Sequence, residues 1–123
     1  MRQVSPCCSA LLIVLLVMPP HVYAQRPITP DPSAPASLRP SMDVAPNGVP
    51  VVNVANPSSS GLSHNLYRDF NVNNQGLIFN NGKGASPTQL GGLITGNPNF
   101  SGAPARAILN EVTLTNRSYI VDP

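Results

Sequence analysis

Apolar and polar residues alternate in short runs along most of the chain, and turn-forming residues separate these runs. The runs cover residues 49–55, 62–72, 77–79, 90–95 and 108–114. Residues two apart share one face of a β-strand, so each run predicts a short strand. Pro50 cannot donate a hydrogen bond to a neighbouring strand, so the first strand should lie at a sheet edge or begin at this residue.

The chain does not show the 3.6-residue period of an amphipathic helix. Residues 103–112 could form a helix by propensity, but the period of two that ends at Thr113 and Thr115 favours a strand. Without crossover helices an α/β fold is excluded. The pattern therefore predicts an all-β domain, and it leaves a sandwich, a barrel and a β-solenoid open.

The amino terminus has the layout of a secretory signal peptide over residues 1–24. A positive start at Arg2 precedes an apolar run over residues 10–18, and we expect cleavage between Ala24 and Gln25. A membrane-spanning helix would need about 20 apolar residues, which is more than this run supplies. Cleavage would remove both cysteines, so the mature chain would have no disulfide and no thiolate metal ligand.

Proline dominates the next segment, residues 25–44. Its prolines are Pro27, Pro30, Pro32, Pro35 and Pro40. Because proline fixes φ and lacks an N–H donor, this segment is predicted to be a disordered, extended leader. The folded part is then expected over residues 45–118, followed by a divergent tail over residues 119–123.

Charge and side-chain chemistry narrow the function. Only 10% of residues are charged, and the formal net charge of +2 falls to +1 once Arg2 is removed. Without a basic cluster, nucleic-acid binding is not predicted. After residue 24 the sequence contains one histidine, His64, and its carboxylates are scattered. Ser63 and His64 are neighbours in a strand and point to opposite faces, so they do not form a hydrolase pair. We therefore predict no catalytic, cofactor-binding or metal-binding residues.

Several motifs between residues 45 and 118 occur in the order found in one known family. They are Pro46-Asn47-Gly48-Val49-Pro50-Val51-Val52-Asn53-Val54, Gly61-Leu62-Ser63-His64-Asn65, Tyr67, Phe70-Asn71-Val72, Gly76-Leu77-Ile78, Asn80-Asn81, Gln89-Leu90-Gly91-Gly92-Leu93-Ile94, Gly96-Asn97-Pro98-Asn99 and Ala107-Ile108-Leu109-Asn110-Glu111-Val112. With these motifs the chain resembles the amino-terminal secretion domain of two-partner-secretion exoproteins, such as filamentous haemagglutinins, haemolysins and contact-dependent inhibition proteins. On this resemblance, residues 45–118 are a partial secretion domain of the haemagglutination-activity type.

The resemblance implies a fold and a partner. The fold would be a right-handed parallel β-helix, here its first coils and amino-terminal cap, with inward Leu, Ile, Val and Phe and with Asn ladders at the corners. The partner would be an outer-membrane β-barrel transporter of a Gram-negative bacterium, which exports the protein from the periplasm to the cell surface or the medium. No cofactor, nucleic acid or small-molecule substrate is implied.

The family's Asn-Pro-Asn-Leu motif corresponds here to Asn97, Pro98, Asn99 and Phe100. The resemblance implies that these residues are recognised by the transporter or start folding. The alternative is a purely structural β-turn, because proline sets φ and asparagine caps the backbone. The family's second Asn-Pro-Asn motif and its repeat-rich shaft are absent, so we interpret the chain as a truncated adhesin, haemolysin or growth-inhibition protein.

Two other classes of protein stay open as alternatives. Parallel β-helices also occur in polysaccharide-active enzymes, although a fragment of such an enzyme would need clustered carboxylates. A free-standing surface-binding module would need aromatic stacking platforms, and the chain has no Trp, three Tyr and three Phe.

Overall fold

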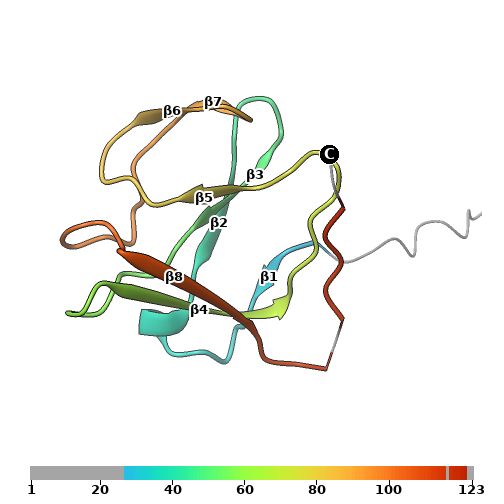
Figure 1. Cartoon of the computed structure of the whole chain (residues 1–123), viewed down its shortest axis with the longest axis vertical. Coiled ribbons are helices and arrows are strands. Elements are labelled where there is room, and N and C mark those ends of the chain that lie inside the picture. Colours follow the sequence, from blue (N-terminus) through green and yellow to red (C-terminus); the bar gives the residue numbers. More distant parts are fainter. Residues whose placement is uncertain (1–26, 116, 122–123) are drawn as a thin grey trace, which may run out of the picture.

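A computed structural model describes residues 27–115 and 117–121 (Figure 1). The predicted signal peptide over residues 1–24, with its cleavage site between Ala24 and Gln25, lies outside the described residues. The elements in chain order are β1 (Thr29–Pro30), the 3-10 helix η2 (Ala36–Leu38), β2 (Ser41–Val44), β3 (Pro50–Asn53), β4 (Leu62–Asp69), β5 (Ile78–Asn80), β6 (Ser86–Thr88), β7 (Gly92–Ile94) and β8 (Ala107–Val112). The all-β prediction is confirmed.

Parallel pairing between strands far apart in sequence builds two stacked coils. In the first coil β3 is followed by β4, and in the second coil β5 pairs with β3 while β8 pairs with β4, both in parallel. The aligned residues include Val51 with Ile78, Leu62 with Ala107 and, in an isolated parallel bridge, Val72 with Ile120. Each strand therefore lies beside its counterpart one turn later, which is the pattern of a solenoid. The prediction of the first coils of a parallel β-helix is confirmed.

The amino-terminal residues form a cap on the first coil, so the prediction of a disordered leader over 25–44 is wrong for the described part. β2 pairs with β3 and β1 pairs with β4, both antiparallel. Ile28 and Ala34 of the cap are buried. Pro30 is the only one of the five prolines of this segment within a cap strand, and β1 lies at a sheet edge, where a missing N–H donor is tolerated. The other four lie outside the strands.

β3 is buried on both faces, because its neighbouring residues Val51 and Val52 point to opposite faces and both are buried. Val52 is fully buried in an inner cluster between the sheets, whereas Val51 belongs to an outer cluster. The inner cluster contains Ile28, Val52, Val54 and Tyr67, with Phe70, Val72, Leu77 and Phe100 packed against it. The outer cluster contains Ala45, Val49, Val51, Ile78 and Ile94. Pro50 begins β3 as predicted, but β3 is the central strand of its sheet and not an edge.

The second coil contains more residues than the first because an insertion, which we call the excursion, lies between β5 and β8. β5 follows its partner β3 by 27 residues, whereas β8 follows β4 by 45 residues, a difference of 18. The extra residues contain the antiparallel hairpin of β6 and β7, which lies outside the coil (Figure 1). Ile94 of this hairpin belongs to the outer cluster, so the hairpin covers the outer face of β3 and β5.

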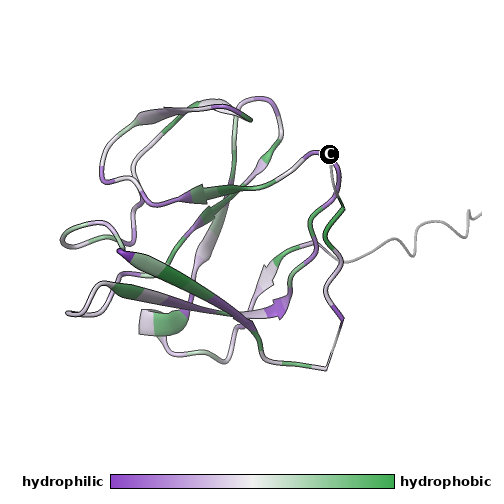
Figure 2. Ribbon diagram, in the orientation of Figure 1, coloured by the Kyte–Doolittle hydropathy of each residue, from purple (hydrophilic) through white to green (hydrophobic). Residues whose placement is uncertain are grey.

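Polar residues line the inner face of β4. Ser63, Asn65, Tyr67 and Asp69 are buried, while the residues between them are partly exposed. The Ser63 hydroxyl donates to the Ala55 carbonyl (2.6 Å), and the Asn65 side-chain oxygen accepts from the Ala55 N–H (2.7 Å). The expectation of inward apolar residues is therefore wrong for β4, because this strand supplies the hydrogen bonds of the adjoining corner. In Figure 2 the carboxyl end of β4 is purple, the colour of hydrophilic residues.

The second coil is far more exposed than the first. Phe79 is 38% exposed, and every residue of β8 except Val112 is exposed. The expected strand over residues 77–79 is observed as β5, Ile78–Asn80, in which Ile78 and Asn80 are buried. Residues 119–121 continue the coil through backbone hydrogen bonds with Val72, so they are not a divergent tail.

Candidate functional site

The side chain of Asn97 closes the base of the excursion that carries β6 and β7. Its Nδ2 donates to the carbonyls of Val54 and Asn80, both at 2.9 Å, and its backbone N–H donates to the Gly82 carbonyl (2.8 Å). Asn97 is 5% exposed. One side chain therefore ties the start of the excursion, its end and the first coil together.

Asn99 and Phe100 attach the same turn to the first coil and its cap. Asn99 Nδ2 donates to the Asn53 carbonyl (2.9 Å) and to the Ser41 hydroxyl (3.2 Å). The Asn99 N–H donates to Asn97 Oδ1 (2.8 Å), and the Phe100 N–H donates to the Asn97 carbonyl (3.3 Å), as in a β-turn. The Phe100 ring packs against the inner cluster.

Two further asparagines of the family motifs, to which the sequence assigned no individual role, complete the corner. Asn53 ends β3 and Asn80 ends β5, and the two residues are aligned in the parallel register. Asn80 Nδ2 donates to Asn53 Oδ1 (2.8 Å) and to the Thr95 carbonyl (3.0 Å). This is an asparagine ladder of the kind that the family resemblance implies. Its sequence signal is an asparagine that closes an apolar run in each of two successive coils.

The predicted motif is thus brought together as one structural unit, the asparagine corner, which consists of Asn53, Asn80, Asn97, Asn99 and Phe100. Pro98 is exposed, while the other motif residues are buried or half-buried. Buried amides satisfied in this way fix a unique arrangement, because an unpaired buried polar group costs about 1–3 kcal/mol. In the folded domain the corner holds the two coils in register, and its amide groups are already engaged.

Ser63 and His64, which the sequence excludes as a hydrolase pair, lie on opposite faces of β4. Ser63 is fully buried, whereas His64 points outward and its Nε2 lies 2.8 Å from Glu111 Oε1 on β8. Within the described residues, three or more His, Cys, Asp or Glu side chains do not gather at any point that could hold a metal ion. No helix of the described part is long and apolar enough to span a membrane.

Asp31 and Tyr67 have shifted pKa values. The Ser33 hydroxyl and N–H donate to Asp31 Oδ1, and with the Thr113 hydroxyl on Oδ2 they lower the pKa of Asp31 below 3.8. Burial raises the pKa of Tyr67, whose hydroxyl donates to Asn110 Oδ1 (3.1 Å). Asp31 thereby links the cap to the segment that follows β8.

The parallel coils, the capping strands and the asparagine corner define the class of the protein. The model of the TPS secretion domain family matches residues 26–121. The chain therefore belongs to the TPS secretion domain family, the domain of two-partner secretion exoproteins. The match begins within the predicted leader, in agreement with the folded cap, and it extends into the predicted tail.

The chain is also similar to curated proteins of known name. It is 52% identical over 118 residues to the 16S rRNA endonuclease CdiA of Enterobacter cloacae subsp. cloacae, covering 91% of this chain and 3% of that protein. It is 43% identical over 116 residues to the Toxin CdiA of Yersinia pestis, covering 94% of this chain and 4% of that protein. It is 38% identical over 112 residues to a Hemolysin of Serratia marcescens, covering 91% of this chain and 7% of that protein.

A solved structure agrees with these relatives. The crystal structure of the filamentous hemagglutinin secretion domain matches with a TM-score of 0.67 and 39% identity, over 79% of this chain and 30% of that one. The chain thus carries the export-targeting region of such exoproteins, and the predicted family is confirmed. A secretion domain of this family implies a partner transporter in general and a secreted or surface location.

Proposed function

We propose that the chain directs the export of an exoprotein through an outer-membrane β-barrel transporter of the two-partner type, and that the transporter recognises it before it folds. The state of the motif residues supports this order of events. In the folded domain the amides of Asn97 and Asn99 bond to first-coil carbonyls, and Phe100 packs against the inner cluster. The transporter can therefore contact the side chains of Asn97, Asn99 and Phe100 only while the chain is unfolded or partly folded.

The predicted signal peptide, cleaved between Ala24 and Gln25, would bring the chain to the periplasm, where the transporter takes it up. Extended segments with alternating apolar residues suit the addition of a strand to a sheet of the transporter, because main-chain hydrogen bonds supply the affinity. The exported protein would be released or held at the cell surface.

Folding outside the cell would then oppose return through the transporter. Val52, Val54 and Tyr67 become fully buried in the folded domain. Each Å² of apolar surface removed from water stabilises the folded state by about 25 cal/mol. The asparagine corner acts in the same step, since it forms only when the second coil stacks on the first.

This role has no catalytic step and needs no cofactor, nucleic acid or small-molecule substrate. The relatives include proteins named as toxins and as a hemolysin. We therefore propose that the exoprotein is an adhesin, a haemolysin or a growth-inhibition protein.

The test is secretion of charged variants in cells that express a two-partner transporter. Leu77→Asp places a charge against the inner cluster, so folding outside the cell should fail and export should stall. Phe79 is 38% exposed, but its ring stacks on Phe70, which packs against that cluster, so Phe79→Asp should also reduce export. Leu93→Asp is the matched control, because Leu93 is 64% exposed. Immunoblots of medium and periplasm give the exported fraction. Unimpaired export of both inner variants, or equal export without the transporter, contradicts the proposal.

A further inference from the structure

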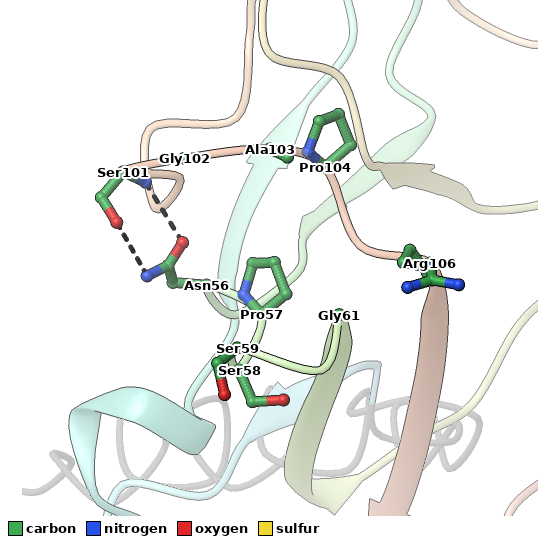
Figure 3. Close-up of a pocket in the computed structure, with 10 residues that line it drawn as sticks. All are labelled: Asn56, Pro57, Ser58, Ser59, Gly61, Ser101, Gly102, Ala103, Pro104 and Arg106. Carbon is green, nitrogen blue, oxygen red and sulfur yellow. Dashed lines mark hydrogen bonds between the residues drawn. The ribbon is translucent and has the colours of Figure 1, made fainter.

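A pocket of about 330 Å³ lies between two loops that stack on each other, next to the asparagine corner (Figure 3). One loop, residues 56–61, leads from β3 into β4, and the other, residues 101–106, leads into β8. Asn56 Nδ2 donates to Ser101 Oγ (3.0 Å), and the Ser101 N–H donates to Asn56 Oδ1 (3.1 Å). This pair fixes one side of the pocket, so the cavity is built by the stacking of the coils.

The lining combines hydroxyl groups, small apolar walls and one cation. Ser58 and Ser59 line the pocket, the Ser58 hydroxyl lying 2.9 Å from the Ser60 hydroxyl, and Pro57 and Pro104 supply apolar walls. Arg106 supplies the positive charge, and no ion pair or hydrogen bond to its guanidinium occurs within residues 27–115 and 117–121.

The position of Arg106 depends on a glycine in the other coil. Gly61 has a φ of 90°, a backbone conformation that residues other than glycine rarely adopt. A Cβ at Gly61 would lie 2.7 Å from Arg106 Cδ and 2.9 Å from Cγ, so the missing side chain leaves room for the arginine stem. The stem therefore lies across the first coil at the pocket, and its guanidinium remains available for a ligand.

We propose that this pocket binds an acidic sugar, such as a sugar phosphate or a uronic acid. A guanidinium forms paired, charge-assisted hydrogen bonds with a phosphate or carboxylate group. The serine hydroxyls match the hydroxyls of a sugar, and the proline rings match its C–H face. The volume falls at the small end of the range for ligand sites, about 300–1,000 Å³, which suits a single sugar ring.

The same lining argues against a neutral sugar as the ligand. Neutral sugars are commonly held by stacking on aromatic rings, and the residues that line this pocket contain no Phe, Tyr or Trp. Recognition must then come from the charge of Arg106 and from the hydroxyl groups. The acidic group is therefore the part of the ligand on which affinity depends.

The experiment is calorimetric titration of the purified chain with glucose 6-phosphate, glucuronate, glucose and inorganic phosphate. The two acidic sugars should bind saturably at one site, and glucose and phosphate should bind at least about tenfold more weakly. Arg106→Gln should weaken the acidic sugars at least about tenfold, and Arg106→Lys should weaken them less. Arg117→Gln, which removes an exposed charge outside the pocket, should leave binding unchanged. Circular dichroism establishes that each variant is folded.

Absence of saturable binding by both acidic sugars overturns the proposal, and so does an equal loss in Arg106→Gln and Arg117→Gln. Binding to phosphatidylcholine vesicles is then measured with and without a lipid that bears a phosphorylated sugar headgroup. The comparison shows whether the ligand is part of a membrane or soluble. Binding to the headgroup vesicles, competed by glucose 6-phosphate, supports a membrane-borne ligand. Binding of the free sugars alone supports a soluble one. Secretion is not the readout, so this test stands apart from the proposed export function.

Discussion

The two coils share one strand plan, yet they differ sharply in burial. In the first coil, β4 buries four polar or aromatic side chains, including Asn65 and Tyr67. In the second coil, the aligned strand β8 exposes apolar side chains, with Ile108 at 36% and Leu109 at 46% exposure. The first coil lies between the cap and the second coil, whereas β5 and β8 are edge strands. In a stack, the number of neighbours decides burial more than the polarity of the side chain does.

The largest expected effect is a difference in stability between the coils when the same residue, Asp, replaces an apolar side chain in each. Val52→Asp places an unpaired carboxylate in the fully buried inner cluster and should lower the free energy of unfolding by more than about 4 kcal/mol. Ile108→Asp, on the exposed β8, should lower it by about 1 kcal/mol or less. Urea unfolding followed by circular dichroism measures both values. Equal losses would remove the distinction between the coils.

The second effect concerns the asparagine corner, through which the coils are joined. Asn97→Ala removes the buried amide that donates to the Val54 and Asn80 carbonyls. The Val54 carbonyl would keep only the Asn99 amide (3.2 Å), so we expect a loss of about 2–4 kcal/mol. Pro98→Ala in the same turn should cost less than about 1 kcal/mol, because Pro98 is exposed. The same urea series tests both. A Pro98 variant as unstable as the Asn97 variant would mean that the turn backbone, and not the amide, holds the coils.

The third effect is a dependence on pH at the cap. Hydrogen bonds from Ser33 and Thr113 lower the pKa of Asp31 from 3.8, so the folded state favours the carboxylate. The stability from Asp31 is complete above pH 3.8 and is lost as the pH falls through the lower folded pKa. Thermal unfolding from pH 6 to pH 2 should show this loss in the native chain and a smaller loss in Asp31→Asn. An identical pH profile in both proteins would contradict the link.

The smallest effect is expected at the outer face of the coils. His64 Nε2 and Glu111 Oε1 lie 2.8 Å apart, but the side chains are 29% and 56% exposed. Glu111→Gln should therefore cost about 0.5 kcal/mol at low salt, and less at high salt. Asp43→Asn, at another exposed carboxylate, serves as the control in the same unfolding series. A loss well above that of the control at high salt would show that the outer pair joins the coils as strongly as the corner does.

Strand positions could be predicted from sequence where a run alternates and has a clear turn on each side. The runs that became β3, β4 and β8 were of this kind, whereas two glycines weakened the run that contains β7. β1 and β2 could not be predicted, because five prolines indicate disorder unless a partner strand is present, and that partner is the first coil. β6 contains Pro87 and has only three residues, so its pairing with β7 depends on tertiary contacts.

The candidate site was located by resemblance, but its physical role needed the structure. The order Asn97, Pro98, Asn99 is compatible with any β-turn, and the sequence does not say which carbonyls the amides reach. Asn53 and Asn80 are separated by 27 residues, so their ladder becomes visible only in the parallel register. The inward polar residues of β4 could not be foreseen either, because alternation gives two faces without saying which one is buried.

The most direct test of the account is whether the chain must be unfolded when the transporter acts. His64→Cys together with Leu109→Cys places two thiols at aligned positions of β4 and β8, in a chain whose native cysteines lie within the predicted signal peptide. Non-reducing gels of periplasm and medium then follow the cross-linked form, with each single variant as a control. We predict that cross-linked chains accumulate in the periplasm and are absent from the medium, and that a reductant restores export. Cross-linked chains that reach the medium as efficiently as the single variants would contradict export of an unfolded domain.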